Sequence, residues 1–388
     1  MAVKIVRQVK NIALLGAPTS AAGLGAGQEG APAALRSAGL AERLTAAGFQ
    51  VTDHGDCAPR VYKPDDEHPR ARNASEALAI IEELRPKVEA AVKSGALAVI
   101  LAGDDTMVLA AIAGSRRYYR HVSVISVDRD AGLNVPATTP SGCLDGMVIS
   151  HIVGRGAPEL VRFWGEPPLI REPDVAVFGI DRVDQPEQKW LGGTPLQHYL
   201  AVDIKRRGAA VAAQEALERV HGSRHEFVLL LDLDAIAAED FAATNFPGSG
   251  GLTLDDIRQA VGVFARQPTL VAFVVSGYNP ARDTDGKAAK IAIDLLEGVL
   301  APRLQAPAAE ATETTAAGAA SGGETPAADT PQSKGPTEVQ TVEPHVEEVT
   351  MVAPSAAPDA AEPAVPSAES AVPEKSSEAH SEGEPPAE

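Results

Sequence analysis

The stretch LAVILAGDDT, residues 97–106, contains the pattern that decides the fold. An apolar run is followed at once by a pair of aspartates, Asp104 and Asp105. The pattern recurs in VSVISVDRD, residues 122–130, and in FVLLLDLD, residues 227–234. Such apolar runs are typical of strands that are buried on both faces, as in parallel sheets. The sequence therefore predicts a parallel sheet whose strands end in acidic residues.

Helical patterns alternate with these and other strand patterns along the chain. Helices are predicted at 32–46, 75–93, 106–113, 209–220, 254–265 and 287–300, and further strands at 11–15, 50–53, 175–180 and 270–275. Pro32 and Gly48 mark the ends of the first helix, and Pro86 is expected to kink or split the second. Repeated strand–helix units predict a three-layer α/β/α fold with a doubly wound, mostly parallel sheet.

The C-terminal part of the chain has a different composition. Residues 305–388 consist largely of Ala, Pro, Glu, Ser and Thr, have no Phe, Trp or Tyr, and carry −14 of the net charge of −19. A segment of this kind buries too little apolar surface to offset the entropy lost on ordering. We therefore predict one domain over residues 1–304 and a disordered acidic tail over residues 305–388.

Composition also bounds location and partners. The two cysteines, Cys57 and Cys143, argue against a disulfide framework and favour a reducing cytoplasm. No apolar stretch approaches the ~20 residues that cross a bilayer, and no basic patch with interleaved aromatic residues is present. The sequence predicts a cytoplasmic protein that binds neither membrane nor nucleic acid.

Five aspartates near the strand ends form the candidate site: Asp105, Asp128, Asp130, Asp232 and Asp234. Ligands of open parallel sheets bind at the carboxyl ends of the strands, so these side chains are expected to converge. Converging carboxylates must take up protons or hold cations. An all-oxygen ligand set favours hard ions such as Mg²⁺, Ca²⁺ or Mn²⁺. The alternative is a metal-free remnant in which Arg129 supplies the counter-charge.

The order of several motifs resembles that of the arginase/ureohydrolase family. The resemblance covers nearly all of residues 11–301 and rests on LGAP at 15–18, LRSAGL at 35–40, DHGD at 53–56, AGDDT at 102–106, VDRDAGLN at 127–134, SGCLDG at 141–146, GIDRVDQPE at 179–187, DLD at 232–234, GGLT at 250–253 and YNP at 278–280. It implies the three-layer α/β/α fold of the arginases and a site at the carboxyl ends of the strands.

The resemblance also implies a metal site, from which this chain departs. Members of the family hold two manganese ions with two histidines and four aspartates. Asp128, Asp232 and Asp234 match these ligands, Asp105 and Asp130 stand at the two histidine positions, and Gly132 stands at the fourth aspartate. Asp145 aligns with the histidine thought to shuttle protons, and Gly277 aligns with the glutamate that grips the guanidinium group.

The positions that would hold the amino-acid end of a substrate depart less from the family. By resemblance, Asn134 and Ser141 match residues that bind the α-carboxylate, and Asp184 and Glu187 match residues around the α-amino group. Cys143 replaces an asparagine, and Phe246 replaces a threonine that lines the pocket.

We therefore expect a divergent arginase-like protein without standard dinuclear manganese activity that binds an amino acid or a guanidino compound. The cofactor is expected to be manganese or another hard divalent cation, or to be absent. A first alternative is an active metal-dependent hydrolase of C–N bonds in linear amidines, with Asp145 in the proton-transfer position. A second is a non-catalytic subunit of a ureohydrolase assembly. By resemblance, the chain is expected to form a homotrimer or homohexamer.

Overall fold

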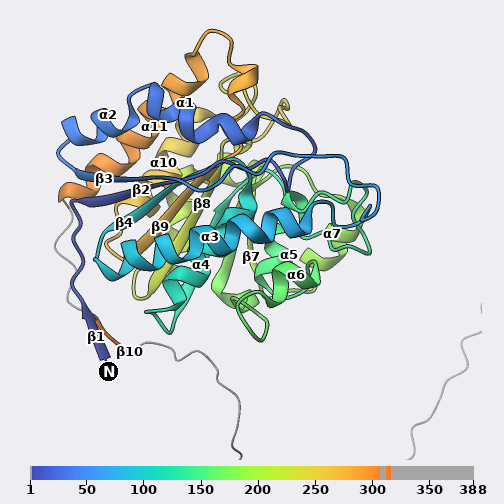
Figure 1. Cartoon of the computed structure of the whole chain (residues 1–388), viewed down its shortest axis with the longest axis horizontal. Helices are drawn as coiled ribbons and strands as arrows, with labels where there is room; N and C mark the ends of the chain where they lie inside the picture. Colours follow the sequence, from blue (N-terminus) through green and yellow to red (C-terminus); the bar gives the residue numbers. More distant parts are fainter. Residues whose placement is uncertain (1, 306–311, 316–388) are drawn as a thin grey trace, which may run out of the picture. The chain divides into compact units, whose positions relative to one another are not determined.

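The strands follow the predicted parallel arrangement. In the computed structural model, which describes residues 2–305 and 312–315, eight parallel strands form one sheet in the order β3-β2-β4-β9-β8-β5-β6-β7 (Figure 1). The strands are β2 Asn11–Ala17, β3 Gln50–Asp56, β4 Leu97–Ala102, β5 Val122–Val127, β6 Val175–Ile180, β7 Gln197–Leu200, β8 Glu226–Asp232 and β9 Leu270–Ser276. A separate antiparallel pair joins β1 Ala2–Ile5 to β10 Thr312–Thr315.

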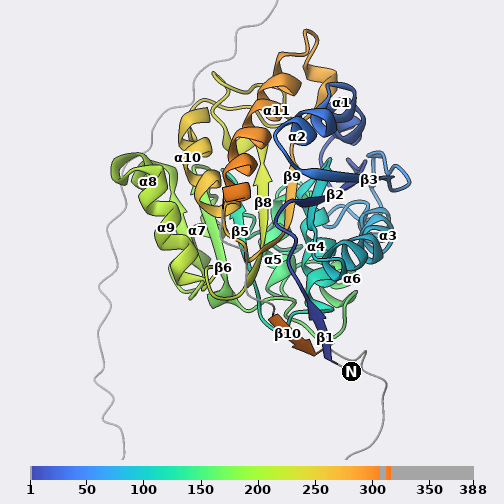
Figure 2. The ribbon, with the colours of Figure 1, turned by 90° about the vertical axis from the view of Figure 1, so that its left-hand side faces the viewer.

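Helices cover both faces of the sheet. One layer contains α1, α2, α11, α10, α9 and α8, and the other contains α3, α4, α5 and α6 (Figures 1 and 2). The helices are α1 Ala31–Ser37, α2 Leu40–Ala46, α3 Ala74–Lys93, α4 Val108–Arg116, α5 Val148–Ile152, α6 Pro158–Arg162, α7 Gln185–Leu191, α8 Ala201–Arg207, α9 Ala209–Arg219, α10 Leu254–Ala265 and α11 Lys287–Leu300. The predicted three-layer fold is confirmed.

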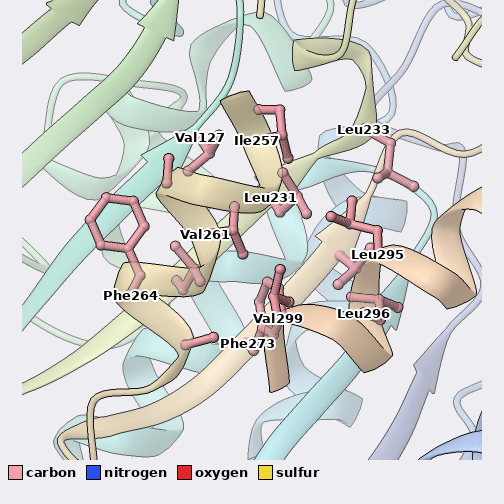
Figure 3. Close-up of a cluster of buried hydrophobic side chains, with 14 of the residues drawn as sticks. Val127, Leu231, Leu233, Ile257, Val261, Phe264, Phe273, Leu295, Leu296 and Val299 are labelled. Atoms are coloured by element: carbon pink, nitrogen blue, oxygen red, sulfur yellow. The ribbon is translucent and has the colours of Figure 1, made fainter. Parts of the chain in front are cut away.

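The alternation of side chains along each strand builds a hydrophobic core on either face. In β4, Leu97, Val99 and Leu101 pack in one core, while Ala98 and Ile100 pack in the other. Figure 3 shows the first core, where Phe264 of α10 and Leu295 of α11 pack above Leu231 and Phe273 of the sheet. Every residue of β4 is buried, as both-face coverage requires.

Several elements differ from the sequence-based expectations. The helix predicted over 32–46 is two helices, because Gly39 has a φ of 90°, in the left-handed region that interrupts a helix. Pro86 does not split α3, which is continuous over Ala74–Lys93. The short elements α5 to α8 and β7 escaped prediction, since four to seven residues carry too little periodicity.

The C-terminal segment is only partly covered by the structure. Thr312–Thr315, within the segment predicted to be disordered, forms β10. The rest of that segment, residues 306–311 and 316–388, lies outside the described residues, so the predicted disorder and domain boundary remain predictions. Among the described residues, no helix has the length and apolar character needed to span a membrane.

Candidate functional site

Five neighbouring strands bring the candidate residues to one edge of the sheet. In the order β4-β9-β8-β5-β6, their carboxyl ends lead to Asp105, Ser276, Asp232, Asp128 and Arg182. The turns after β5 and β8 are built alike: Asp128 accepts a hydrogen bond from the amide of Asp130 at 2.7 Å, and Asp232 accepts one from Asp234 at 2.7 Å. Aspartate favours such local turns because its carboxylate bonds the backbone two residues on.

Three of the predicted ligands face one another. Asp105, Asp128 and Asp232 are buried, and one carboxylate oxygen from each lies within 4.8 Å of the other two. Asp105 also accepts a hydrogen bond from the Ser276 hydroxyl. We call these three residues the aspartate triad.

Burial makes the triad costly to ionise. Loss of hydration and neighbouring carboxylates raise the pKa values of Asp105 and Asp128 well above their ordinary range, and that of Asp232 to about 7. The triad therefore either takes up protons or holds a cation. Three convergent carboxylate oxygens suit one hard divalent cation.

The other two predicted ligands contact an arginine. Both carboxylate oxygens of Asp130 accept hydrogen bonds from Arg182, at 2.6 and 2.5 Å, and one oxygen of Asp234 accepts a third at 2.9 Å. Burial lowers the pKa of Arg182, but Asp130 and Asp234 outweigh that effect and raise the pKa above its ordinary value. The guanidinium therefore stays charged and offsets one of the two negative charges that Asp130 and Asp234 can carry.

The backbone explains why Arg182 reaches the cluster. The segments after β5 and β6 continue to pair, with Arg182 donating its amide to the carbonyl of Arg129 at 2.9 Å. The Arg129 side chain instead bonds Asp181 at 2.7 Å and the carbonyl of Gly248 at 3.0 Å. Arg182, and not Arg129, therefore makes the direct contacts with Asp130 and Asp234, while Arg129 acts on Asp234 through its charge without a hydrogen bond.

This arrangement bears on the two-metal site that the resemblance implies. A second cation would need the oxygens of Asp130 and Asp234, three of which bond Arg182. In the described part of the chain, the remaining Asp234 oxygen is buried without a hydrogen-bond partner. The residues fit one hard cation at the triad and do not fit a second while Arg182 holds its place.

Asp145 and Cys143 line the same cavity. Asp145 accepts a hydrogen bond from the amide of Asp105 at 2.8 Å. Burial, with Asp104 nearby, raises its pKa well above the ordinary range. Cys143 is buried, its thiol donates to the carbonyl of Ala22 at 3.0 Å, and burial raises its pKa. A thiol that resists ionisation is a poor nucleophile.

Gly277 leaves no room for a side chain. Its φ is 81°, and a Cβ atom there would lie 1.9 Å from a carboxylate oxygen of Asp232. A side chain at this position would require the Asp232 carboxylate to move. Gly277 itself offers no carboxylate to a guanidinium group.

Two adjoining cavities open at this edge. The inner one, about 140 Å³, is lined by the five aspartates with Asp145, Arg182, Cys143, Leu24 and Phe246 among others. The outer one, about 490 Å³, is lined by Asn134, Ser141, Asp184 and Glu187, the predicted substrate-binding residues. Asp130 and Arg182 line both cavities, so the ion pair lies between them.

The outer residues also support the local fold. Asp184 begins α7 with a capping box in which it accepts a hydrogen bond from the amide of Glu187. Asn134 donates to the second oxygen of Asp184 at 2.8 Å, and Glu187 accepts from the amide of Leu133. Ligand binding by these residues remains a prediction.

A parallel α/β/α fold with an aspartate cluster at the strand ends defines a class of proteins able to hold hard cations. Within that class, the arginase family model matches residues 10–301. The chain is 27% identical over 300 residues to the arginase of Bacillus caldovelox, covering 76% of this chain and 100% of that relative. It is 30% identical over 302 residues to the mitochondrial arginase-2 of Rattus norvegicus, covering 76% and 85%.

The structural comparison agrees. The solved arginase structure from Bacillus cereus superposes with a TM-score of 0.69 at 25% identity, covering 75% of this chain and 98% of that one. The chain belongs to the arginase family, which confirms the resemblance read from the motifs.

Proposed function

We propose that this chain is an arginase-family protein that does not perform two-metal hydrolysis and that binds a small amino-acid or guanidino ligand. The observation that carries the proposal is the Arg182 guanidinium, which bonds Asp130 and Asp234 where a second cation would need them. Gly277 adds support, because it leaves no carboxylate to hold a guanidinium group.

The charge of the outer cavity indicates which ligand it favours. Asp130, Asp181, Asp184 and Glu187 line it, and Arg182 is the basic residue among the lining residues. Arg182 is paired with Asp130 and Arg129 with Asp181, so among the described residues Asp184 and Glu187 are the lining carboxyl groups without a basic partner, and they make the cavity negative. A cationic amine or guanidinium group is favoured there over an anion.

A second candidate function, hydrolysis with one oxygen-ligated cation, rests on the aspartate triad. A hard divalent cation held by Asp105, Asp128 and Asp232 would supply a Lewis acid at the inner cavity. Asp145 lines that cavity, and its raised pKa favours the protonated form, so it is placed to transfer a proton there.

Metal content and turnover separate the two candidates. We expect at most one manganese ion per chain after dialysis against Mn²⁺, measured by elemental analysis, and no urea or amine release from arginine, agmatine or guanidino acids. Two bound ions per chain would contradict the proposed replacement of a cation by Arg182. One bound ion with turnover would establish the second candidate instead.

Ligand binding is tested with the metal removed by chelation. We expect arginine or ornithine to raise the unfolding temperature, because a ligand that binds only the native state stabilises it. Asp184→Asn should abolish the shift, since it removes a charge but keeps an oxygen able to cap α7. Asp255→Asn, an equal charge change on exposed α10, is the control and should leave the shift unchanged. No shift with any basic amino acid would contradict ligand binding.

A further inference from the structure

A large cavity lies at the opposite end of the sheet, where β5 and β8 begin. Its volume is about 520 Å³, and it lies between the end of α4, the segment before β6 and the turn before β8. Six basic side chains line it, against one acidic residue, Asp174: Arg116, Arg120, Arg171, His121, His221 and His225. We call it the basal cavity.

The positive charge of the basal cavity is only partly neutralised. Arg171 pairs with Asp174 at 2.9 Å. The Arg116 guanidinium donates to the carbonyl of Leu169, and burial lowers its pKa. Within residues 2–305 and 312–315, no ion pair neutralises Arg116 or Arg120. Neither guanidinium charge is therefore neutralised, and Arg116 keeps further N–H donors beside the one that bonds Leu169, in a chain whose net charge is −19.

Three histidines from two distant segments gather at the same place: His121 precedes β5, and His221 and His225 lie in the turn before β8. The rings of His121 and His225 lie 5.4 Å apart, and those of His221 and His225 lie 6.4 Å apart. Among the described residues, only the aspartate triad brings ligand atoms together closely enough for a metal ion. The histidines therefore suit hydrogen bonding to an anion better than metal binding.

We propose that the basal cavity binds a small multivalent phosphate-type anion, such as a diphosphate. Arginine forks bond phosphate oxygens two at a time, and the N–H groups of the imidazole rings add further donors. The volume lies within the range of ordinary ligand pockets. The three arginines exceed Asp174 by two positive charges, which matches an anion with more than one negative charge.

This site is separate from the aspartate cluster. The six residues of β5 run from Val122, which lines the basal cavity, to Val127, which precedes Asp128. Six residues of strand span about 20 Å. Binding at the basal cavity therefore requires no cation at the triad, and it can be measured with a chelator present.

The test is calorimetric titration of the full chain with inorganic pyrophosphate at physiological ionic strength in excess chelator. We expect saturable binding of one pyrophosphate per chain. Arg120→Gln, a change at an exposed position, should weaken the affinity at least ~5-fold, and Arg116→Gln/Arg120→Gln together at least ~50-fold, since each change removes charge-assisted hydrogen bonds to the anion.

Controls make the outcome decisive. Arg206→Gln removes an equal charge from exposed α8 and should leave the affinity unchanged. Unfolding curves of each variant show whether it is folded, and Arg120→Gln keeps the test valid should Arg116→Gln unfold the chain. Absence of saturable binding, or equal binding by the folded variants, would overturn the proposal. Tighter binding of citrate than of pyrophosphate would contradict the assignment of the ligand as a phosphate-type anion.

Discussion

At the scale of single residues, Arg182 is the most informative side chain in the site. Its guanidinium places one positive charge beside Asp130 and Asp234, both of which otherwise sit among like charges. A buried carboxylate without a partner is costly, so either a cation or a basic side chain must accompany it. Here the chain itself supplies the positive charge for two of its five clustered aspartates.

Replacing Arg182 by methionine should therefore change both stability and metal content. In chelator, Arg182→Met leaves the 4% exposed Asp234 side chain unpaired and should lower the free energy of unfolding by roughly 2 kcal/mol. The loss is smaller than for a fully buried pair, because Arg182 and Asp130 are each more than one-third exposed. With Mn²⁺ supplied, we expect bound metal to rise by one ion per chain, measured by elemental analysis.

Arg182→Lys is the matched control for this prediction. It keeps the positive charge, so metal content should stay at the wild-type value even though the fork-like contact with Asp130 is lost. If Arg182→Met bound no more manganese than Arg182→Lys, Arg182 would not be what excludes a second cation.

At the scale of elements, strands and helices with a strong hydrophobic pattern were predicted with their correct ends. The bounds of β4, β5, β6, α10 and α11 agree with the predicted ranges, because long apolar runs and strong helical periodicity leave few alternatives. The break between α1 and α2 was missed. It depends on the left-handed conformation of one residue, Gly39, which periodicity does not reveal.

Replacing two glycines by alanine tests the role of backbone conformation, because the two changes are expected to shift the free energy of unfolding in opposite directions. Gly39→Ala should destabilise the protein by about 1 kcal/mol, because φ is 90° while the added Cβ would have space. Gly298→Ala, inside α11, should stabilise it by roughly 0.5–1 kcal/mol, because beyond the chain neighbours and the adjoining backbone of its own helix nothing lies within 4 Å of the added Cβ. Urea unfolding measures the change in the free energy of unfolding for each variant. If both variants shifted it in the same direction, backbone conformation would not determine the effect of the substitution.

The candidate site was only partly predictable for a related reason. The aspartates could be placed together because each follows a strand at the same edge of the sheet. The partner of Asp130 could not, because Arg182 lies 52 residues away and meets it only when β6 lies beside β5. Arg129, adjacent in sequence, was the natural candidate, but its side chain turns to Asp181. The sequence feature that could have identified this partner is an arginine shortly after the end of the neighbouring strand, β6.

At the scale of the whole molecule, two buried groups change the free energy of unfolding in opposite directions as pH falls. The folded state raises the pKa of Asp232 to about 7. The stability that Asp232 contributes is therefore fully present at pH values below its pKa in the unfolded chain, and it is lost as pH rises toward 7. His151 acts in the opposite direction. Burial lowers its pKa to about 3, and in the described part of the chain neither ring nitrogen has a hydrogen-bond partner.

The sign for His151 follows from proton binding. Between its unfolded pKa of about 6.5 and the folded value of about 3, the unfolded chain binds a proton that the folded chain does not. This group therefore makes stability fall as pH falls, by up to about 1.4 kcal/mol per pH unit. Leucine at this position would remain neutral and lose no hydrogen bond, so His151→Leu should remove this dependence.

Unfolding of wild type and His151→Leu in urea, followed by the fluorescence of Trp164 and Trp190 in chelator from pH 7.5 to 4.5, tests this prediction. The aspartates contribute equally to both proteins, so the difference between the two curves isolates His151. We expect that difference to be small at pH 7.5 and to grow steadily in favour of the variant below pH 6.5. The control His54→Leu removes an exposed histidine and should leave the slope unchanged. Parallel curves for wild type and His151→Leu would mean that the buried imidazole gains its proton without unfolding.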